Sequence, residues 1–247
     1  MFNFFVDKNK ILNGNVVIDG ADYNHIKNVL RMKENEEFLV SADGKSHLCQ
    51  LVKYENESAI AKIIEQDYMD TSLSIKITLF QGLPKSDKME LIIQKAVELG
   101  AEQIVPVETA RSIVKIEPKK ADAKRQRWQA IAESAAKQSK RTLIPTVLAP
   151  IKFNDAFKII PDLDLLIVPY ESKHGMADTL TALKELKRCM HVGVFIGAEG
   201  GFEEAEIARL KDAGGRIVSL GKRILRTETA SITALSMLML YAETMLG

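Results

Sequence analysis

The stretch from His191 to Glu206, HVGVFIGAEGGFEEAE, constrains the fold of this chain more than any other part of it. It opens with the alternating apolar residues Val192, Val194 and Ile196, a pattern typical of a buried strand. A glycine-rich turn, Gly197 to Gly201, comes next, and acidic residues then stand where the positive end of a helix dipole favours them. The order of strand, glycine loop and helix predicts a nucleotide-type pocket, because glycines let a ligand approach the backbone closely.

The spacing within this loop excludes two common phosphate-binding motifs. Neither G-x-G-x-x-G nor G-x-x-x-x-G-K-[ST] is present there. The carboxylate of Glu199 lies inside the loop and would repel a pyrophosphate. The loop therefore favours a ligand with an adenosine-like body and little negative charge, and a nicotinamide dehydrogenase is a distant alternative.

The pattern of the chain changes after Asp70-Thr71-Ser72, so we expect two domains, 1–72 and 73–247. In the first, short apolar runs between Asn-Gly and Asp-Gly turn signals predict a small β-barrel-like domain with strands at 38–40, 47–52 and 59–64 and one helix at 25–32. In the second, strand and helix patterns alternate, which predicts an α/β fold with a parallel sheet and helices on both faces. The expected strands are 75–80, 104–107, 143–148, 165–168, 192–196 and 217–220; the expected helices are 87–99, 121–139, 155–160, 179–186, 204–213 and 229–246.

Composition narrows the class of protein. The net charge is +1, so any nucleic-acid surface has to come from local patches. The two cysteines, Cys49 and Cys189, have no metal-type spacing, which argues against a disulfide scaffold or a zinc site and favours a reducing cytoplasm. We expect no signal peptide and no membrane span, because the longest uncharged run, 229–242, is short and contains Ser and Thr.

Basic residues cluster in three places. Lys222, Arg223 and Arg226 precede the last helix, where cations are disfavoured by roughly 0.3–1 kcal/mol each unless an anion is bound nearby. Residues 111–141 hold ten Lys and Arg against three acidic residues, with the single tryptophan, Trp128, among them, a composition typical of RNA binding. The helix at 25–32 carries a smaller cluster. Solvated helix faces are the alternative for both helical clusters.

Several motifs in the same order resemble the RsmE family of small-subunit ribosomal RNA uridine-N3 methyltransferases of the SPOUT class. They are HIKNVLRM, KMELIIQKAVELGA, RWQAIAESAAKQSKR, IGAEGGF and LGKRILRTETA, and together they extend over most of the chain. The chain departs from the family pattern at Ala198, where proline is common, and at Lys137 and Lys140.

The resemblance implies a PUA-like RNA-binding barrel, a SPOUT domain with a C-terminal trefoil knot, and S-adenosylmethionine as the cofactor. For methyl transfer to uracil N3, Arg226 is the candidate for stabilising the uracil anion, and Glu228 or Glu171 is the candidate base. The implied cofactor-binding residues are Val168, Pro169, Tyr170, Ile196, Gly197, Glu199, Gly200, Gly201, Leu220, Gly221, Leu225, Thr227 and Ala230. The implied RNA-binding residues are His25, Arg31, Lys85, Arg111, Lys124, Arg127, Gln138 and Arg141.

The expected partners are ribosomal RNA or the small ribosomal subunit and a second copy of the chain, with no metal. A homodimer is expected because the segment 229–246 is apolar around its whole axis, which a single domain of this size does not cover. Two other functions stay open: a ribose 2′-O or transfer-RNA methyltransferase of the same fold, and a non-catalytic RNA-binding assembly factor.

Overall fold

The structure is a computed structural model that describes residues 1–245. The chain forms two compact units: residues 1–72 together with 136–144, and residues 73–135 together with the chain from Pro145 onward. The return of residues 136–144 to the first unit was not expected from the sequence. Within the described residues, no helix is both long enough and apolar enough to cross a membrane.

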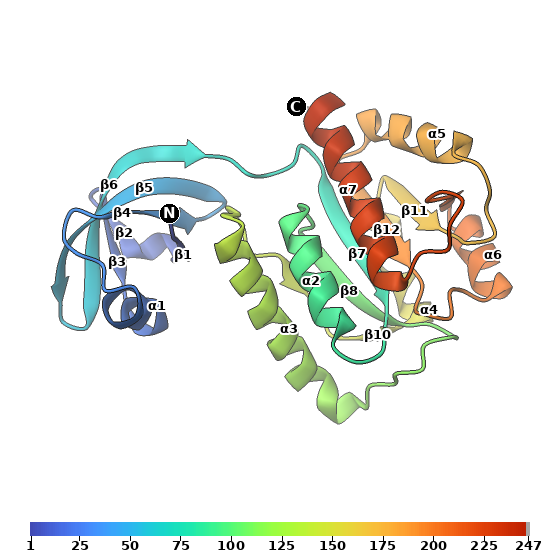
Figure 1. The fold of residues 1–247 in the computed structure, drawn as a ribbon, viewed down its shortest axis with the longest axis horizontal. Helices are drawn as coiled ribbons and strands as arrows, with labels where there is room; N and C mark the ends of the chain where they lie inside the picture. The colour runs from blue at the N-terminus through green and yellow to red at the C-terminus, as the bar shows by residue number, and fades with distance from the viewer. Residues whose placement is uncertain (246–247) are drawn as a thin grey trace. The chain divides into compact units, whose positions relative to one another are not determined.

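The first unit is built on a curled six-stranded sheet (Figure 1) in the order β1-β4-β5-β6-β3-β2. The strands are β1 (Asn3–Phe5), β2 (Ile11–Leu12), β3 (Asn15–Ile18), β4 (Glu37–Ala42), β5 (Lys45–Glu55) and β6 (Ser58–Met69). Only the β1–β4 pairing is parallel. One side of the sheet buries Phe4, Val16, Phe38, Cys49 and Leu51 around Ile26, so the predicted β-rich domain is confirmed.

The helix expected at 25–32 is displaced toward the N-terminus. Helix α1 (Gly20–Asn24) begins after Asp19 and continues into a wider helical turn, η2 (His25–Val29). The helical conformation ends before Arg31, whose φ of 52° is left-handed. Apolar periodicity located Ile26, the buried residue of the turn, but could not show where the helix begins.

Residues 136–144 are held in the first unit by hydrogen bonds to both ends of its chain. The Asn3 side-chain amide donates to the carbonyl oxygen of Arg141 (3.1 Å), and the Thr71 hydroxyl donates to that of Lys140 (3.2 Å). The Lys137 ammonium lies 2.8 Å from the carboxylate of Asp22. The strand expected at 143–148 is therefore reduced to β9 (Thr146–Val147), because the residues before it belong to the first unit.

The second unit contains a fully parallel sheet in the order β10-β8-β7-β12-β11-β13, with β9 paired to β8. Its other strands are β7 (Lys76–Gly82), β8 (Gln103–Glu108), β10 (Ile151–Lys152), β11 (Leu165–Pro169), β12 (His191–Ile196) and β13 (Arg216–Val218). Its helices are α2 (Lys88–Glu98), α3 (Pro118–Gln138), α4 (Phe153–Ala156), α5 (Ala177–Glu185), α6 (Glu204–Asp212) and α7 (Thr227–Met245). The predicted alternation and parallel sheet are confirmed.

Helices cover both faces of this sheet (Figure 1). Helix α7 packs on β12 and beside α2, whereas Phe153 of α4 and Leu210 of α6 join Phe195 of β12 in a second core. Phe80 and Phe195 stack on neighbouring strands with ring centroids 5.3 Å apart. The central strands are thus buried on both sides, which fixes the positions of the loops at their carboxyl ends.

The helices α2 and α6 begin in different ways. Asp87 stands at the N-cap of α2, but its side chain makes no capping hydrogen bond. Helix α6, by contrast, has a complete capping box between Glu203 and Glu206. Glu206 also accepts a hydrogen bond from the backbone N–H of Ala110 (2.9 Å), so this acidic residue ties the start of α6 to the loop after β8.

Candidate functional site: a glycine-walled cavity

A cavity of about 470 Å³ opens at the carboxyl ends of β11 and β12, beside the segment that joins β13 to α7. This is the edge at which open parallel sheets bind ligands. The residues that line it come from three segments: 169–171 with Lys173 and His174, 196–202, and 219–225 with Thr227 and Ala230. Of the thirteen residues expected to bind the cofactor, the structure places all but Val168 at this cavity; Val168 is fully buried in the sheet.

The loop after β12 is tight, and its glycines are required for that shape. The N–H of Gly201 donates to the carbonyl oxygen of Ala198 (2.9 Å), and Gly201 has a left-handed φ of 69°. A Cβ on Gly197 would lie 3.0 Å from the carbonyl carbon of Gly201. A Cβ on Gly200 would instead lie 2.9 Å from Cβ of Arg111, so a side chain there would displace Arg111.

Gly82 is a site residue that sequence reasoning missed. It ends β7, and a Cβ on it would lie 2.4 Å from the backbone nitrogen of Ala198 and 2.7 Å from the carbonyl carbon of Gly197. Both are backbone atoms, which cannot move aside as a flexible side chain can. The cavity loop can therefore lie against β7 only because residue 82 has no side chain.

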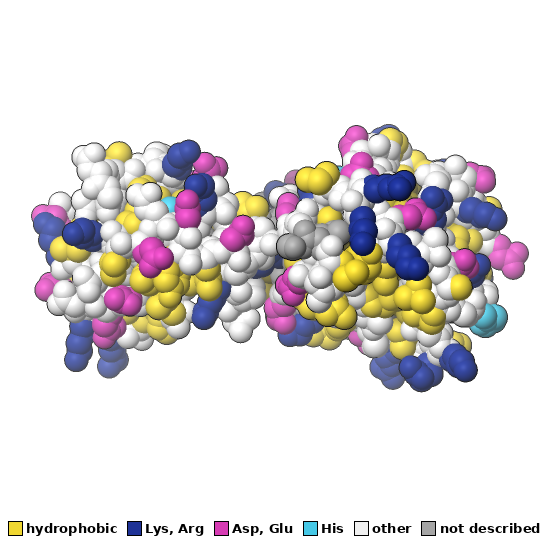
Figure 2. Space-filling view, turned by 90° about the horizontal axis from the view of Figure 1, so that it is seen from above, with side chains coloured by type: hydrophobic (Ala, Val, Ile, Leu, Met, Phe, Trp, Pro, Cys, Tyr) yellow, Lys and Arg dark blue, Asp and Glu magenta, His cyan; other side chains and the backbone are white. Residues whose placement is uncertain are grey.

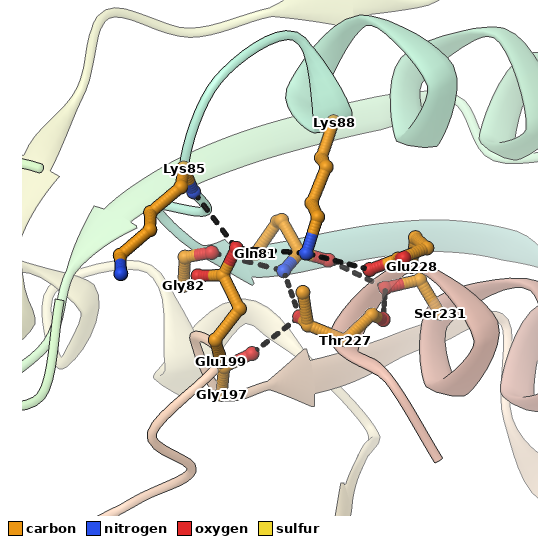
Figure 3. Close-up of polar contacts among 9 residues, drawn as sticks. All are labelled: Gln81, Gly82, Lys85, Lys88, Gly197, Glu199, Thr227, Glu228 and Ser231. Carbon is orange, nitrogen blue, oxygen red and sulfur yellow. Dashed lines mark hydrogen bonds and ion pairs between the residues drawn. The ribbon is translucent and has the colours of Figure 1, made fainter. Parts of the chain in front are cut away.

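A buried polar network holds the loop to α7 (Figure 3). The Thr227 hydroxyl donates to the carbonyl oxygen of Gly197 (2.6 Å) and accepts from the side-chain amide of Gln81 (2.9 Å). The Ser231 hydroxyl lies 2.5 Å from the amide oxygen of Gln81. All three side chains are at most 5% exposed, and buried groups satisfied in this way fix one arrangement of the chain.

The carboxylate of Glu199 is directed toward the start of α2 (Figure 3). One of its oxygens accepts from the backbone N–H of Lys85 (2.9 Å) and from the ammonium of Lys88 (3.1 Å). Burial favours the neutral acid, but these two hydrogen bonds outweigh it and hold the pKa of Glu199 below its ordinary value. The sequence argument that this charge repels phosphate is thereby weakened, because Lys88 compensates it.

The two residues expected to act in catalysis flank the cavity but are not part of its lining. Arg226 lies between the lining residues Leu225 and Thr227, and its side chain is exposed. The Glu228 side chain is 15% exposed and lies in the first turn of α7, 3.5 Å from the ammonium of Lys88. Glu171, the other carboxylate considered as a base, lines the cavity.

The expected RNA-binding residues fall into separate groups. Lys85 and Arg111 lie beside the cavity loop, because Lys85 binds Glu199 and the Arg111 guanidinium donates to the carbonyl oxygen of Gly200 (3.0 Å). On α3, Lys124 lies over the ring of Trp128, and Arg127 pairs with Glu90 at 2.6 Å.

The remaining four belong to the first unit. His25, Arg31 and Gln138 are exposed there. Arg141 is only 4% exposed, which leaves its guanidinium little surface for RNA. Trp128, which lies among the basic residues of α3, is 4% exposed and therefore belongs to the core rather than to an RNA-binding surface.

Sequence reasoning also missed Gln81, Lys88 and Ser231. Gln81 and Gly82 directly follow the strand expected at 75–80, which was the available signal for a site at that strand end. Among the residues that the structure describes, no group of three His, Cys, Asp or Glu side chains could hold a metal ion.

The sequence of this chain is similar to those of known RNA methyltransferases. Residues 71–239 match an RNA methyltransferase domain, and residues 18–64 match an RNA methyltransferase PUA domain. The chain is 39% identical to the ribosomal RNA small subunit methyltransferase E of Bacillus subtilis, over 93% of this chain and 91% of that protein.

Two solved structures that hold S-adenosylmethionine are also similar. One is the ribosomal RNA small subunit methyltransferase E of Neisseria gonorrhoeae, at 33% identity and a TM-score of 0.80, with 96% of this chain and 95% of that chain covered. The other is a putative methyltransferase of Legionella pneumophila, at 27% identity and a TM-score of 0.79, with 96% of each chain covered. The chain therefore belongs to the RsmE family of RNA methyltransferases.

Proposed function

We propose that this protein transfers the methyl group of S-adenosylmethionine to N3 of a uridine in small-subunit ribosomal RNA. The observation that carries the proposal is the cavity of about 470 Å³ at the carboxyl edge of the parallel sheet, walled by the Gly197–Gly201 loop, in a chain of the RsmE family. The cytoplasm, where ribosomal subunits are assembled, is the proposed location.

The cavity suits S-adenosylmethionine in size and in charge. Its volume lies in the range of about 300–1,000 Å³ that is typical of small-molecule sites. Gly197, Gly200 and Gly201 offer backbone at its wall, and the carboxylate of Glu171 supplies negative charge for a cationic ligand. When bound, the cofactor supplies an electrophilic methyl group on a sulfonium.

The protein residues have two tasks in this reaction. The first is to position uracil N3 in line with the methyl group, which requires the base to be unpaired or extruded from any helix. The second is to accept the N3 proton and stabilise the negative charge that spreads to the ring oxygens. Arg226 is the proposed charge stabiliser, and Glu228 or Glu171 the proposed base.

We propose that the PUA-like domain, residues 1–72 with 136–144, binds the RNA through His25, Arg31 and Gln138. Lys85, Arg111, Lys124 and Arg127 form the corresponding contacts in the methyltransferase domain. Arg141 is the weakest member of this set because its side chain is buried. A trefoil knot formed by the segments after β12 and β13 is part of the proposed fold.

The protein is also proposed to act as a homodimer through α7. The buried residues of α7 form one stripe, Thr227, Ser231, Ala234, Leu235, Leu238 and Ala242. The opposite side leaves Leu240 61% exposed, Met245 at the end of the helix is 54% exposed, and apolar side chains gather on one face of this unit (Figure 2). A second copy would cover that face.

One experiment separates this function from its two alternatives. The protein is incubated with S-adenosylmethionine labelled on the methyl group and with undermethylated small ribosomal subunits, and the modified nucleoside is identified by mass spectrometry. We expect 3-methyluridine. A 2′-O-methylated nucleoside, or labelling of transfer RNA instead, would favour another RNA methyltransferase activity, and no labelled nucleoside would favour an assembly factor.

A further inference from the structure

Lys88 occupies a position that its own helix does not favour. It is the first residue of α2, where the N-terminal end of the helix dipole makes a cation unfavourable by roughly 0.3–1 kcal/mol. Its side chain is 30% exposed and extends toward two carboxylates rather than into water (Figure 3). A lysine at this position therefore has its electrostatic partners outside α2.

The two partners come from different parts of the chain. Glu199 belongs to the cavity loop after β12, and its carboxylate lies 3.1 Å from the Lys88 ammonium. Glu228 belongs to the first turn of α7, with one oxygen 3.5 Å from the same ammonium. The Lys88 side chain thus joins three segments: the start of α2, the cavity loop and the start of α7.

Glu228 depends on Lys88 more than Glu199 does. Glu199 keeps a second donor, the backbone N–H of Lys85, whereas one oxygen of Glu228 is buried with no hydrogen-bond donor among the described residues. The nearby ammonium is the positive charge that compensates this carboxylate. Without it, two carboxylates would face the same small volume, and one of them would be buried without a partner, an expensive arrangement in a protein interior.

We infer that Lys88 is a positioning residue of the methyltransferase site: it holds the Gly197–Gly201 loop and the start of α7 in register by bridging Glu199 and Glu228. The inference rests on the proposed function for its effect on the cofactor. Lys88 is outside the cavity lining and acts through Glu199, which is part of it. Losing the bridge loosens the wall of the cavity and weakens cofactor binding.

The test compares Lys88→Met, Lys88→Arg and the double variant Lys88→Met/Glu228→Gln in the full chain. Lys95→Met is the matched control, because Lys95 lies on the same helix and its ammonium pairs only with Glu98, three residues away on that helix, as far as the described contacts show. Calorimetry with S-adenosylmethionine gives Kd for all four variants, and steady-state kinetics give KM for the three that keep Glu228. Thermal unfolding reports whether each variant is folded.

We expect Lys88→Met to raise Kd and KM for S-adenosylmethionine about tenfold, which lies within the range of coupling energies measured between contacting charged groups. Lys88→Arg and Lys95→Met should stay within about twofold of the native protein. By calorimetry, the double variant should recover part of the lost affinity, because glutamine removes the unpaired buried charge. Native affinity in Lys88→Met, or no recovery in the folded double variant, would overturn the inference.

Amide hydrogen exchange without ligand gives a second readout that does not depend on the proposed function. Exchange within 197–201 should be faster in Lys88→Met than in Lys95→Met, and equal rates would overturn the bridge. Should Lys88→Met not fold, Lys88→Gln takes its place in both measurements, with the same outcomes decisive. A native protein that binds no S-adenosylmethionine but shows this exchange difference would defeat the proposed function and leave the bridge standing.

Discussion

The cavity loop and the basic surface of α3 lie in the same unit but are stabilised in opposite ways. The loop depends on missing side chains and on buried hydrogen bonds, such as the one from Thr227 to Gly197. The basic surface depends on exposed groups, and Arg127, which pairs with Glu90, keeps 59% of its side chain in solvent. Buried polar networks respond strongly to a single change, whereas exposed ion pairs contribute about 0–1 kcal/mol and are screened by salt.

The largest effect should come from filling the space at Gly82. Gly82→Ala places a Cβ against the backbone of Ala198, and the loop has to move away from β7, at a cost of about 1–3 kcal/mol. Calorimetry should detect no S-adenosylmethionine binding. Gly175→Asn is the control, because a Cβ there meets nothing and asparagine tolerates its left-handed φ of 82°. Native affinity for S-adenosylmethionine in Gly82→Ala would show that the loop can move away from β7 without losing its binding conformation.

Arg226→Ala tests an exposed residue that flanks the cavity. Removing a group that stabilises developing negative charge costs about 10²–10³ in kcat, and cofactor affinity should change little because Arg226 is not part of the cavity lining. Single-turnover methylation and calorimetry separate the two effects. Arg188→Ala, a change at another exposed arginine, should have no effect on either. Near-native turnover in Arg226→Ala would remove this residue from the mechanism.

Thr227→Val measures the buried network directly. Valine has a similar shape but leaves the Gly197 carbonyl without the Thr227 hydroxyl and the Gln81 amide with one acceptor fewer, so the free energy of unfolding should fall by about 1–3 kcal/mol. Thr227→Ser keeps the hydroxyl and should lose much less. Urea unfolding checks both variants, and equal loss in the two would mean that packing rather than hydrogen bonding stabilises this site.

The basic surface should respond more weakly and in a salt-dependent way. Lys124→Ala should raise KM for RNA a few-fold and reduce the slope of log affinity against log salt by about one. Arg127→Ala should do less, because Arg127 must leave Glu90 to reach a phosphate. Filter binding at several salt concentrations measures both. An unchanged slope for Lys124→Ala would assign α3 to solvated surface.

The smallest effect concerns the acid stability of the loop. Because the folded-state pKa of Glu199 is below its ordinary value of 4.5, its contribution to stability is fully present above about pH 4.5 and is lost as the pH falls through the lower folded-state value. In Glu199→Gln, the thermal unfolding midpoint should therefore depend less on pH across this acidic range than it does in the native protein. Glu204→Gln, at an exposed position, is the control, and identical profiles in the two variants would contradict this assignment.

Much of the second unit was predictable because its signals are local. Strand and helix alternation predicted the parallel sheet, and the ends of β11, β12 and β13 identified the segments that meet at the cavity. The closeness of Gly82 to Ala198 was not predictable, since it joins segments more than a hundred residues apart and has no local pattern. The same is true of Lys88, whose two partners lie on other elements.

The direction of a side chain was the other unpredictable quantity. Glu199 was correctly expected near the cavity, but the sequence could not show that its carboxylate faces Lys88. Arg141 lies in a strongly basic segment, yet the structure buries it, because hydrogen bonds from Asn3 and Thr71 draw residues 140–141 into the first unit. Charge along a sequence therefore does not show which members of a basic segment are exposed.

The return of residues 136–144 to the first unit has a consequence for how the protein is made. During synthesis from the N-terminus, residues 1–72 leave the ribosome long before the segment that completes their unit. Asn3 and Thr71 then lack their partners while residues 73–135 are translated. The first unit can reach its final state only after the chain has emerged as far as Ile144, so a nascent chain arrested before that point should be more sensitive to proteolysis within residues 1–72 than one arrested beyond it.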